Sequence, residues 1–255
     1  MGPAPARGAM VKTAINLYSV RALEEPVLDT LDRVADAGYD GVQLSGGLGA
    51  LGDAGAEAVA ARLDEHGLEP TPPHVGMDEL TDEVDAVYEA FGETLGCDGA
   101  VIPHVDHEHF ADAGAVDAFA ADVNEVAVAL DGRGWDLHYH NHDFEFTDLG
   151  EETAYDRFCA GTGAQLELDV GWAQVGGEDP ADLLRRLDDR LDVVHMKDMH
   201  VDEREFAEIG EGDVDMQACA DAARDVDAEW LVYEHDDPED PAASIETGAA
   251  FLDSL

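Results

Sequence analysis

The sequence has few basic residues and almost no lysine. Only 13 lysine and arginine residues stand against 60 aspartate and glutamate residues, so the formal net charge is −47. The two lysines are Lys12 and Lys197. A surface this acidic repels phosphate backbones and anionic lipids, which argues against nucleic acid or a membrane as a partner.

Cysteine and long apolar runs are also scarce. Cys97, Cys159 and Cys219 lie far apart and form no C-x-x-C motif, as expected for free thiols in a reducing cytoplasm. No run of about 18 apolar residues occurs, so no membrane-spanning helix is predicted. Residues 1–11 lack the apolar segment of a signal peptide, and we expect a flexible tail there. The sequence therefore predicts a cytoplasmic protein.

The acidic residues are spread along the whole chain, which is typical of a solvated surface rather than an interaction tail. Such a chain repels itself in dilute buffer, whereas in concentrated salt the Debye length falls to about 3 Å and the repulsion is screened. The composition resembles that of cytoplasmic proteins from salt-in halophiles. In such a cell every protein is acidic, so the argument against a nucleic-acid partner is weaker there.

Short β-type runs alternate with amphipathic helical stretches through the whole chain. The predicted strands are residues 13–18, 41–44, 69–75, 100–103, 136–142, 165–170, 193–197 and 230–234. The predicted helices are residues 26–38, 56–66, 81–96, 115–133, 154–159, 179–187, 216–226 and 241–252. Strand–helix alternation requires right-handed parallel crossovers, and eight units in 255 residues predict one (β/α)8 barrel over residues 12–255. A doubly wound open sheet is the main alternative, but residues 18–23 lack its glycine-rich turn.

The ends of the last four predicted strands carry metal-ligating side chains. His138, His140 and His142 alternate along the fifth strand and therefore share one face. Glu145 lies just beyond that strand, and Asp169, His195 and Glu234 lie at the ends of the next three strands. The C-terminal ends of barrel strands meet at one mouth, where active sites form. Mixed imidazole and carboxylate ligands suit Mn²⁺, Fe²⁺, Co²⁺, Zn²⁺ or Mg²⁺, so we expect a divalent metal site.

An ordered set of motifs resembles a known family. The strings YSVRALEEP, GYDGVQLSG, YHNHDFEF, LDVGWAQVGGEDP, HMKDM and IGEGDVD are similar to the xylose-isomerase-like TIM-barrel superfamily of sugar phosphate isomerases and epimerases, here of a halophilic archaeal type. The resemblance implies one divalent ion, held by Asp169, His195 and Glu234. For the first ligand it favours Glu145, with His140 as the second choice.

The same resemblance implies a reaction. Glu145 and Glu234 would flank a sugar as base and acid, and a proton next to a carbonyl would leave through a metal-stabilised enediolate. Lys197 would hold or polarise a substrate oxygen, unless it only pairs with acids such as Asp198. The expected protein is therefore a metal-dependent sugar isomerase or epimerase acting on a small sugar or keto-sugar. A dehydratase or lyase acting on an inosose or 3-keto-sugar is the alternative.

Other side chains at the predicted mouth could contact such a substrate. They are His74, His104, His142 and Trp172. Trp172 would offer an apolar face to a sugar ring, or else anchor a loop. An endonuclease of the endonuclease IV type shares the fold, but Gln43, where relatives often have glutamate, and the scarcity of cations count against it. The sequence leaves open whether the barrel only binds a ligand without catalysis. It also leaves open whether the protein forms a homo-oligomer.

The acidic surface predicts salt-dependent stability. Raising KCl from low to molar concentration should raise the melting temperature, because counterions screen the repulsion among the carboxylates. Thermal unfolding followed by circular dichroism over a KCl series measures this. A melting temperature that does not rise would contradict adaptation to concentrated salt.

Overall fold

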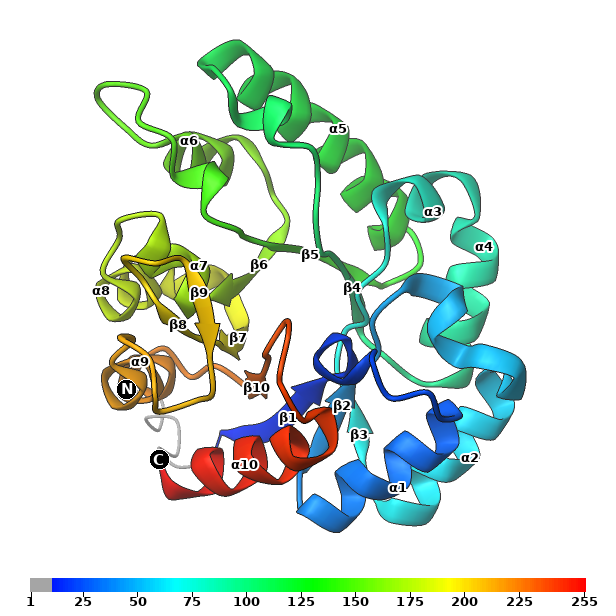
Figure 1. Cartoon of the computed structure of the whole chain (residues 1–255). Helices are drawn as coiled ribbons and strands as arrows, with labels where there is room; N and C mark the ends of the chain where they lie inside the picture. Colours follow the sequence, from blue (N-terminus) through cyan, green and yellow to red (C-terminus); the bar gives the residue numbers. More distant parts are fainter. Residues whose placement is uncertain (1–10) are drawn as a thin grey trace, which may run out of the picture.

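A parallel barrel forms the centre of the computed structural model, which describes residues 11–255 (Figure 1). Its strands within that range are β1 (Lys12–Asn16), β2 (Gly41–Gln43), β3 (Glu69–Pro70), β4 (Gly99–Ile102), β5 (Asp136–His140), β6 (Gln165–Asp169), β7 (Leu191–Met196) and β10 (Trp230–Tyr233). The expected tail over residues 1–11 lies outside the described residues, except for Val11. The predicted (β/α)8 barrel is confirmed.

The strand order brings the ends of the chain together and closes the sheet. Along the sheet the order is β3-β2-β1-β10-β7-β6-β5-β4, and every neighbouring pair is parallel. The extended segment after β3 joins the two edges, since the Val75 N–H donates to the Val101 carbonyl and the Val101 N–H to that of Pro73, both at 2.9 Å. The register sets Asp169 of β6 level with His195 of β7. Side chains from separate strands therefore meet at one height.

Helices surround the strands, and each strand-to-strand crossover includes at least one of them (Figure 1). They are α1 (Val27–Ala37), α2 (Ala56–His66), α3 (Met77–Asp82), α4 (Val84–Val87), α5 (Ala113–Asp131), α6 (Ala154–Gly161), α7 (Val170–Val175), α8 (Pro180–Arg186), α9 (Met216–Asp225) and α10 (Pro241–Ser254). A π-helical segment covers residues 88–94, and 3-10 turns cover residues 17–20, 47–54, 107–110, 144–146 and 188–190. None of the helices in the described part is long and apolar enough to cross a bilayer.

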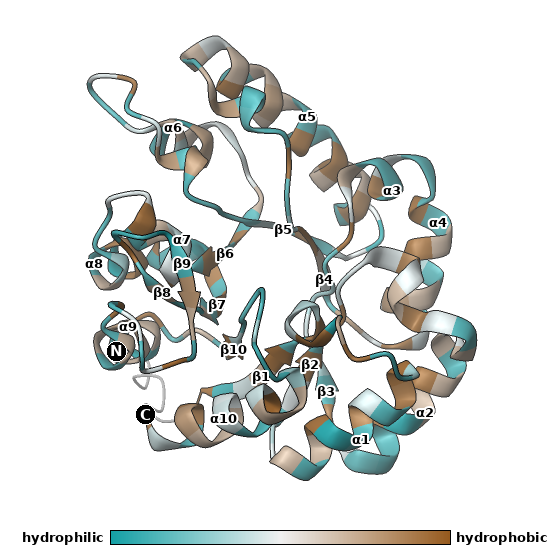
Figure 2. Ribbon diagram, viewed as in Figure 1, coloured by the Kyte–Doolittle hydropathy of each residue, from teal (hydrophilic) through white to brown (hydrophobic). Residues whose placement is uncertain are grey.

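The apolar core lies between the strands and the inner faces of the helices (Figure 2). Under α5 and α6 it is aromatic: the Phe158 ring lies 4.6 Å from the Tyr139 ring and 5.4 Å from the Phe119 ring, between centroids. Tyr139 faces this outer layer from β5. Because side chains alternate along a strand, its neighbours His138 and His140 face the barrel interior. One strand thus serves both the core and the site.

Two predicted elements differ in extent. The third strand was expected over residues 69–75, but β3 ends at Pro70, because Pro72 and Pro73 have no N–H to donate to a ladder. A helix was expected to begin at Thr81. Instead α3 begins after Gly76, and the Thr81 hydroxyl donates to the Met77 carbonyl within that helix (2.8 Å).

A small hairpin follows β7 and was not predicted. It consists of the antiparallel strands β8 (Asp198–His200) and β9 (Glu205–Ala207). The buried carboxylate of Asp198 holds the chain that follows, since it accepts hydrogen bonds from the backbone N–H groups of Gly210, Gly212 and Val214. Asp215 caps α9 by accepting a hydrogen bond from the Ala218 N–H (3.0 Å).

Candidate metal centre

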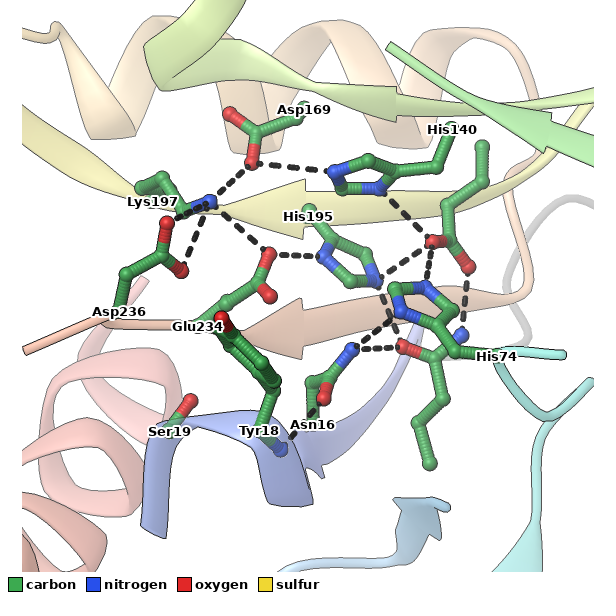
Figure 3. A network of polar contacts seen from close by, with 12 residues as sticks. Asn16, Tyr18, Ser19, His74, His140, Asp169, His195, Lys197, Glu234 and Asp236 are labelled. Carbon is green, nitrogen blue, oxygen red and sulfur yellow. Dashed lines mark hydrogen bonds and ion pairs between the residues drawn. The ribbon is translucent and has the colours of Figure 1, made fainter. Parts of the chain in front are cut away.

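Polar side chains from most of the strands meet inside the C-terminal half of the barrel (Figure 3). They form two groups of metal-ligating atoms, each with its atoms within 4.8 Å of one another. The upper cluster, toward the strand ends, consists of His140, Asp169, His195 and Glu234. The lower cluster consists of His74, His140, Glu167 and His195. All of these residues are buried, and His140 and His195 belong to both clusters.

The upper cluster contains the predicted ligands Asp169, His195 and Glu234, together with His140, the second choice for the first ligand. The Nδ1 atom of His195 lies 2.7 Å from Oε2 of Glu234. The Nε2 atom of His140 lies 3.8 Å from Oδ2 of Asp169. The structure thus brings together one group from the end of each of β5, β6, β7 and β10.

In the lower cluster one carboxylate oxygen faces three imidazole rings. Oε1 of Glu167 lies 2.6 Å from His74 Nε2, 3.0 Å from His140 Nδ1 and 2.9 Å from His195 Nε2. Its other oxygen accepts a hydrogen bond from the Gln43 amide at 2.6 Å. Asn16 completes the layer: its amide nitrogen lies 2.7 Å from the Gln43 oxygen and 3.2 Å from His74 Nδ1.

The Lys197 ammonium lies above the upper cluster and is itself buried. It is 3.0 Å from Oδ2 of Asp169, 3.2 Å from Oε2 of Glu234 and 3.1 Å from Oδ1 of Asp236. It also lies 5.2 Å from the Trp172 ring centre. Lys197 is therefore paired, but with acids at the strand ends and not with Asp198, whose carboxylate binds backbone groups instead.

Burial and pairing shift the pKa values of these groups in opposite directions. Burial alone would lower the pKa of His195, but Glu167 and Glu234 outweigh it and raise that pKa to about 10. Burial alone would raise the pKa of Glu234, but Lys197 and His195 hold it well below its usual range. For Asp169 burial dominates over Lys197, and the pKa rises to about 6. At neutral pH Glu234 is thus ionised, as a ligand of a cation must be.

The upper cluster fits a divalent cation better than the lower one. Among the described residues, the buried Oδ2 of Asp169 has an ion-pair contact with the Lys197 ammonium at 3.0 Å but no well-aligned hydrogen bond. Every ligating atom of the lower cluster, by contrast, has a hydrogen-bond partner. Two imidazoles and two carboxylates form a donor set suited to Mn²⁺, Fe²⁺, Co²⁺ or Zn²⁺. The buried cluster could therefore hold a divalent metal ion.

Glu145, the preferred first ligand, belongs to neither cluster. The chain leaves β5 and forms a 3-10 turn over residues 144–146, which directs the Glu145 carboxylate into the wall behind the strand. There it accepts hydrogen bonds from the Tyr139 hydroxyl (2.8 Å) and the His142 backbone N–H (2.9 Å). His140 occupies the place in the upper cluster that Glu145 was expected to fill.

The other expected contact residues take different positions. The rings of His142 and Trp172 lie 5.6 Å apart, and each has a buried nitrogen without a hydrogen-bond partner among the described residues. His104 is exposed, and its ring meets His142 edge-on at 4.8 Å. His74 is buried deep in the barrel and contacts Glu167 rather than the mouth. Phe206 of β9 packs on Trp172 at 5.7 Å and covers this side.

Sequence reasoning missed three of the residues that complete the centre. Glu167 and Asp236 each lie two positions from an expected ligand, Asp169 and Glu234, so strand periodicity could have placed them on the same face. Asn16 ends β1 just before a 3-10 turn and has no expected ligand two positions away, so strand periodicity could not have identified it.

The chain belongs to the xylose isomerase-like TIM barrel family, whose model matches residues 31–255. No curated protein matches the chain in sequence. The motifs that suggested this family therefore identified it correctly.

Solved structures agree on the fold. A sugar phosphate isomerase/epimerase from Parabacteroides distasonis superposes with a TM-score of 0.80 at 20% identity, over 99% of this chain and 97% of that chain. A probable 3-DHS dehydratase of petrobactin synthesis from Bacillus anthracis reaches 0.75 at 13% identity, over 95% and 99%. A D-allulose 3-epimerase from Methylomonas sp. reaches 0.69 at 14% identity, over 98% and 99%.

The environment of Glu145 predicts a pH-dependent contribution to stability. Burial raises the pKa of Glu145 to about 8, against a usual value near 4.5. The folded state therefore holds this proton more tightly, and the stabilisation is lost as the pH rises through about 8. Glutamine mimics the protonated acid and does not titrate. Between pH 5 and pH 9 the wild type should therefore lose on the order of 4 kcal/mol of unfolding free energy relative to Glu145→Gln. Urea unfolding across this pH range measures the free energy of unfolding of both proteins. A difference between them that does not change with pH would contradict the prediction.

Proposed function

We propose that the protein is a divalent-metal-dependent isomerase or epimerase of keto-sugars. The observation that supports this most is the upper cluster, where buried ligand atoms from β5, β6, β7 and β10 converge within 4.8 Å. The family membership and the sugar isomerase and epimerase neighbours agree with an enzyme of this kind.

In this proposal His140, Asp169, His195 and Glu234 hold the ion. When bound, the ion supplies a Lewis acid that polarises a substrate carbonyl and its neighbouring hydroxyl. Oδ2 of Asp169, which lies beside the Lys197 ammonium, would become a ligand of the ion. His140 stands in for Glu145, whose carboxylate is engaged behind the strand.

The protein's own groups would move and hold the protons. Glu234 is ionised at neutral pH and is the candidate base for a proton next to the carbonyl. The Lys197 ammonium is a fixed donor that would hold a substrate oxygen. The unpartnered ring nitrogens of His142 and Trp172 would bind hydroxyl groups, and the face of Trp172 suits a sugar ring.

The charges at the mouth favour a substrate without phosphate. Lys197 is surrounded by Asp169, Glu234 and Asp236, so its charge is already more than balanced. A phosphate group would meet these carboxylates with no free cation in the cluster to bind it. We therefore propose an uncharged sugar or keto-sugar.

A dehydratase is the second candidate, because the probable dehydratase from Bacillus anthracis shares the fold at a TM-score of 0.75. The same base could remove the proton while a hydroxyl on the next carbon leaves. Incubating keto-sugars with the protein in D₂O separates the two. Deuterium at the carbon next to the carbonyl in an epimer or isomer supports the first candidate, and loss of water supports the second.

Removing one carboxylate of the upper cluster should remove the metal. Protein purified in concentrated KCl should contain about one divalent ion per chain, and Asp169→Ala should contain almost none while remaining folded. Elemental analysis measures both. Asp136→Ala, at the opposite end of the barrel, is the matched control and should keep the ion. A metal-free wild type that cannot be loaded would contradict the proposal.

Lys197 and the ion are expected to compete for the same oxygens. Lys197→Met keeps the apolar stem but removes the charge, so it should bind the divalent ion about tenfold more tightly. Turnover of the sugar should nevertheless fall about a hundredfold, because the donor to the substrate is gone. Lys12→Met, the only other lysine and an exposed one, should change neither quantity. Weaker metal binding by Lys197→Met would show that Lys197 supports the site instead.

A further inference from the structure

We propose that Glu167 is a positioning residue, which fixes the proton position of His140 and the ring orientations of His140 and His195 so that both rings face the upper cluster correctly. This inference rests on the proposed metal site. It concerns a residue that lies below the site and that the proposed reaction does not use.

Glu167 reaches both shared histidines from their far side. Its Oε1 atom lies 3.0 Å from Nδ1 of His140 and 2.9 Å from Nε2 of His195, while the opposite ring nitrogens face Asp169 and Glu234. An ionised carboxylate only accepts hydrogen bonds. For His140 the carboxylate at hydrogen-bond distance is Glu167, so the proton lies on the lower nitrogen and the upper nitrogen is the one aimed at the cation. His195 has carboxylates at hydrogen-bond distance from both ring nitrogens, so there Glu167 fixes the ring orientation rather than the tautomer.

His140 is the more informative of the two, because two carboxylates compete for its proton. Glu167 lies 3.0 Å from Nδ1, whereas Asp169 lies 3.8 Å from Nε2. The closer contact favours the proton on Nδ1 and leaves the Nε2 lone pair free. Without the charge on Glu167, Asp169 would draw the proton to Nε2, where it would block the metal-binding position.

Glu167 itself is held firmly in place. It is fully buried, its second oxygen accepts from Gln43, and His74 lies 2.6 Å from its first oxygen. His74 in turn is within reach of Asn16 through its other nitrogen (Figure 3). These contacts satisfy the lower cluster with hydrogen bonds, so we assign it to orientation rather than to a second metal.

The test uses Glu167→Gln, which keeps the shape and removes the charge. Its matched control is Glu145→Gln, because Glu145 is another fully buried glutamate of the same barrel but touches neither cluster. Thermal unfolding first shows that each variant is folded. Histidine ¹⁵N NMR on the metal-free proteins then reports which ring nitrogen of His140 carries the proton.

We expect the His140 proton on Nδ1 in wild type and Glu145→Gln, and a substantial shift to Nε2 in Glu167→Gln. Affinity for Co²⁺ should fall about 10- to 100-fold in Glu167→Gln alone, with an altered visible spectrum of the bound ion. An unchanged tautomer together with unchanged affinity would overturn the inference. So would Glu167→Gln and His74→Asn both failing to bind Co²⁺ at saturating concentration, since Glu167 would then be a ligand.

A failure of the proposed function has a different signature. If wild type binds no divalent ion, the metal site fails, whatever the tautomer measurement shows. If wild type binds the ion and Glu167→Gln binds it equally well with the same spectrum, the site stands and the role of Glu167 fails. The two outcomes cannot be confused.

Discussion

Charged groups inside a barrel are stable only when they are paired, and this constraint organises the centre of the molecule. Burying an isolated carboxylate or ammonium costs several kcal/mol. Here Lys197 is enclosed by three carboxylates, and His195 lies between Glu234 and Glu167. Removing any one partner leaves a charge unpaired, so the layers depend on one another.

Side chains on one face of a strand recur every two residues, so the paired groups lie at two heights in the barrel. Glu167 and Asp169 lie on the same face of β6, one step apart in height. On β7, His195 is level with Asp169, and Lys197 follows one step higher on the same face. Hydrogen bonds among the side chains hold the lower level, whereas in the upper level the described residues give Oδ2 of Asp169 an ion-pair contact with Lys197 but no well-aligned hydrogen bond. A barrel interior that usually holds aliphatic side chains here holds a polar network beneath the upper cluster.

The sequence predicted what depends on periodicity and missed what depends on loops. The barrel, and the meeting of Asp169, His195 and Glu234, follow from strand alternation and from the common mouth of parallel strands. The direction of Glu145 could not be predicted, because it is set by the tight turn over residues 144–146 and by the Tyr139 hydroxyl behind the strand. Glu167 was overlooked because an acid inside an apolar strand has no evident role until its three imidazole partners, from separate strands, are seen together.

Charge balance links the proposed cation to the proposed uncharged substrate. The centre holds the carboxylates of Glu167, Asp169, Glu234 and Asp236, against which stand the ammonium of Lys197 and the imidazole of His195. Even with both basic groups charged, the balance stays negative. A divalent cation corrects it, whereas a phosphorylated ligand would deepen it. A substrate that offers only carbonyl and hydroxyl oxygens adds no charge, and can therefore bind beside Lys197 without disturbing the pairs on which the layers depend.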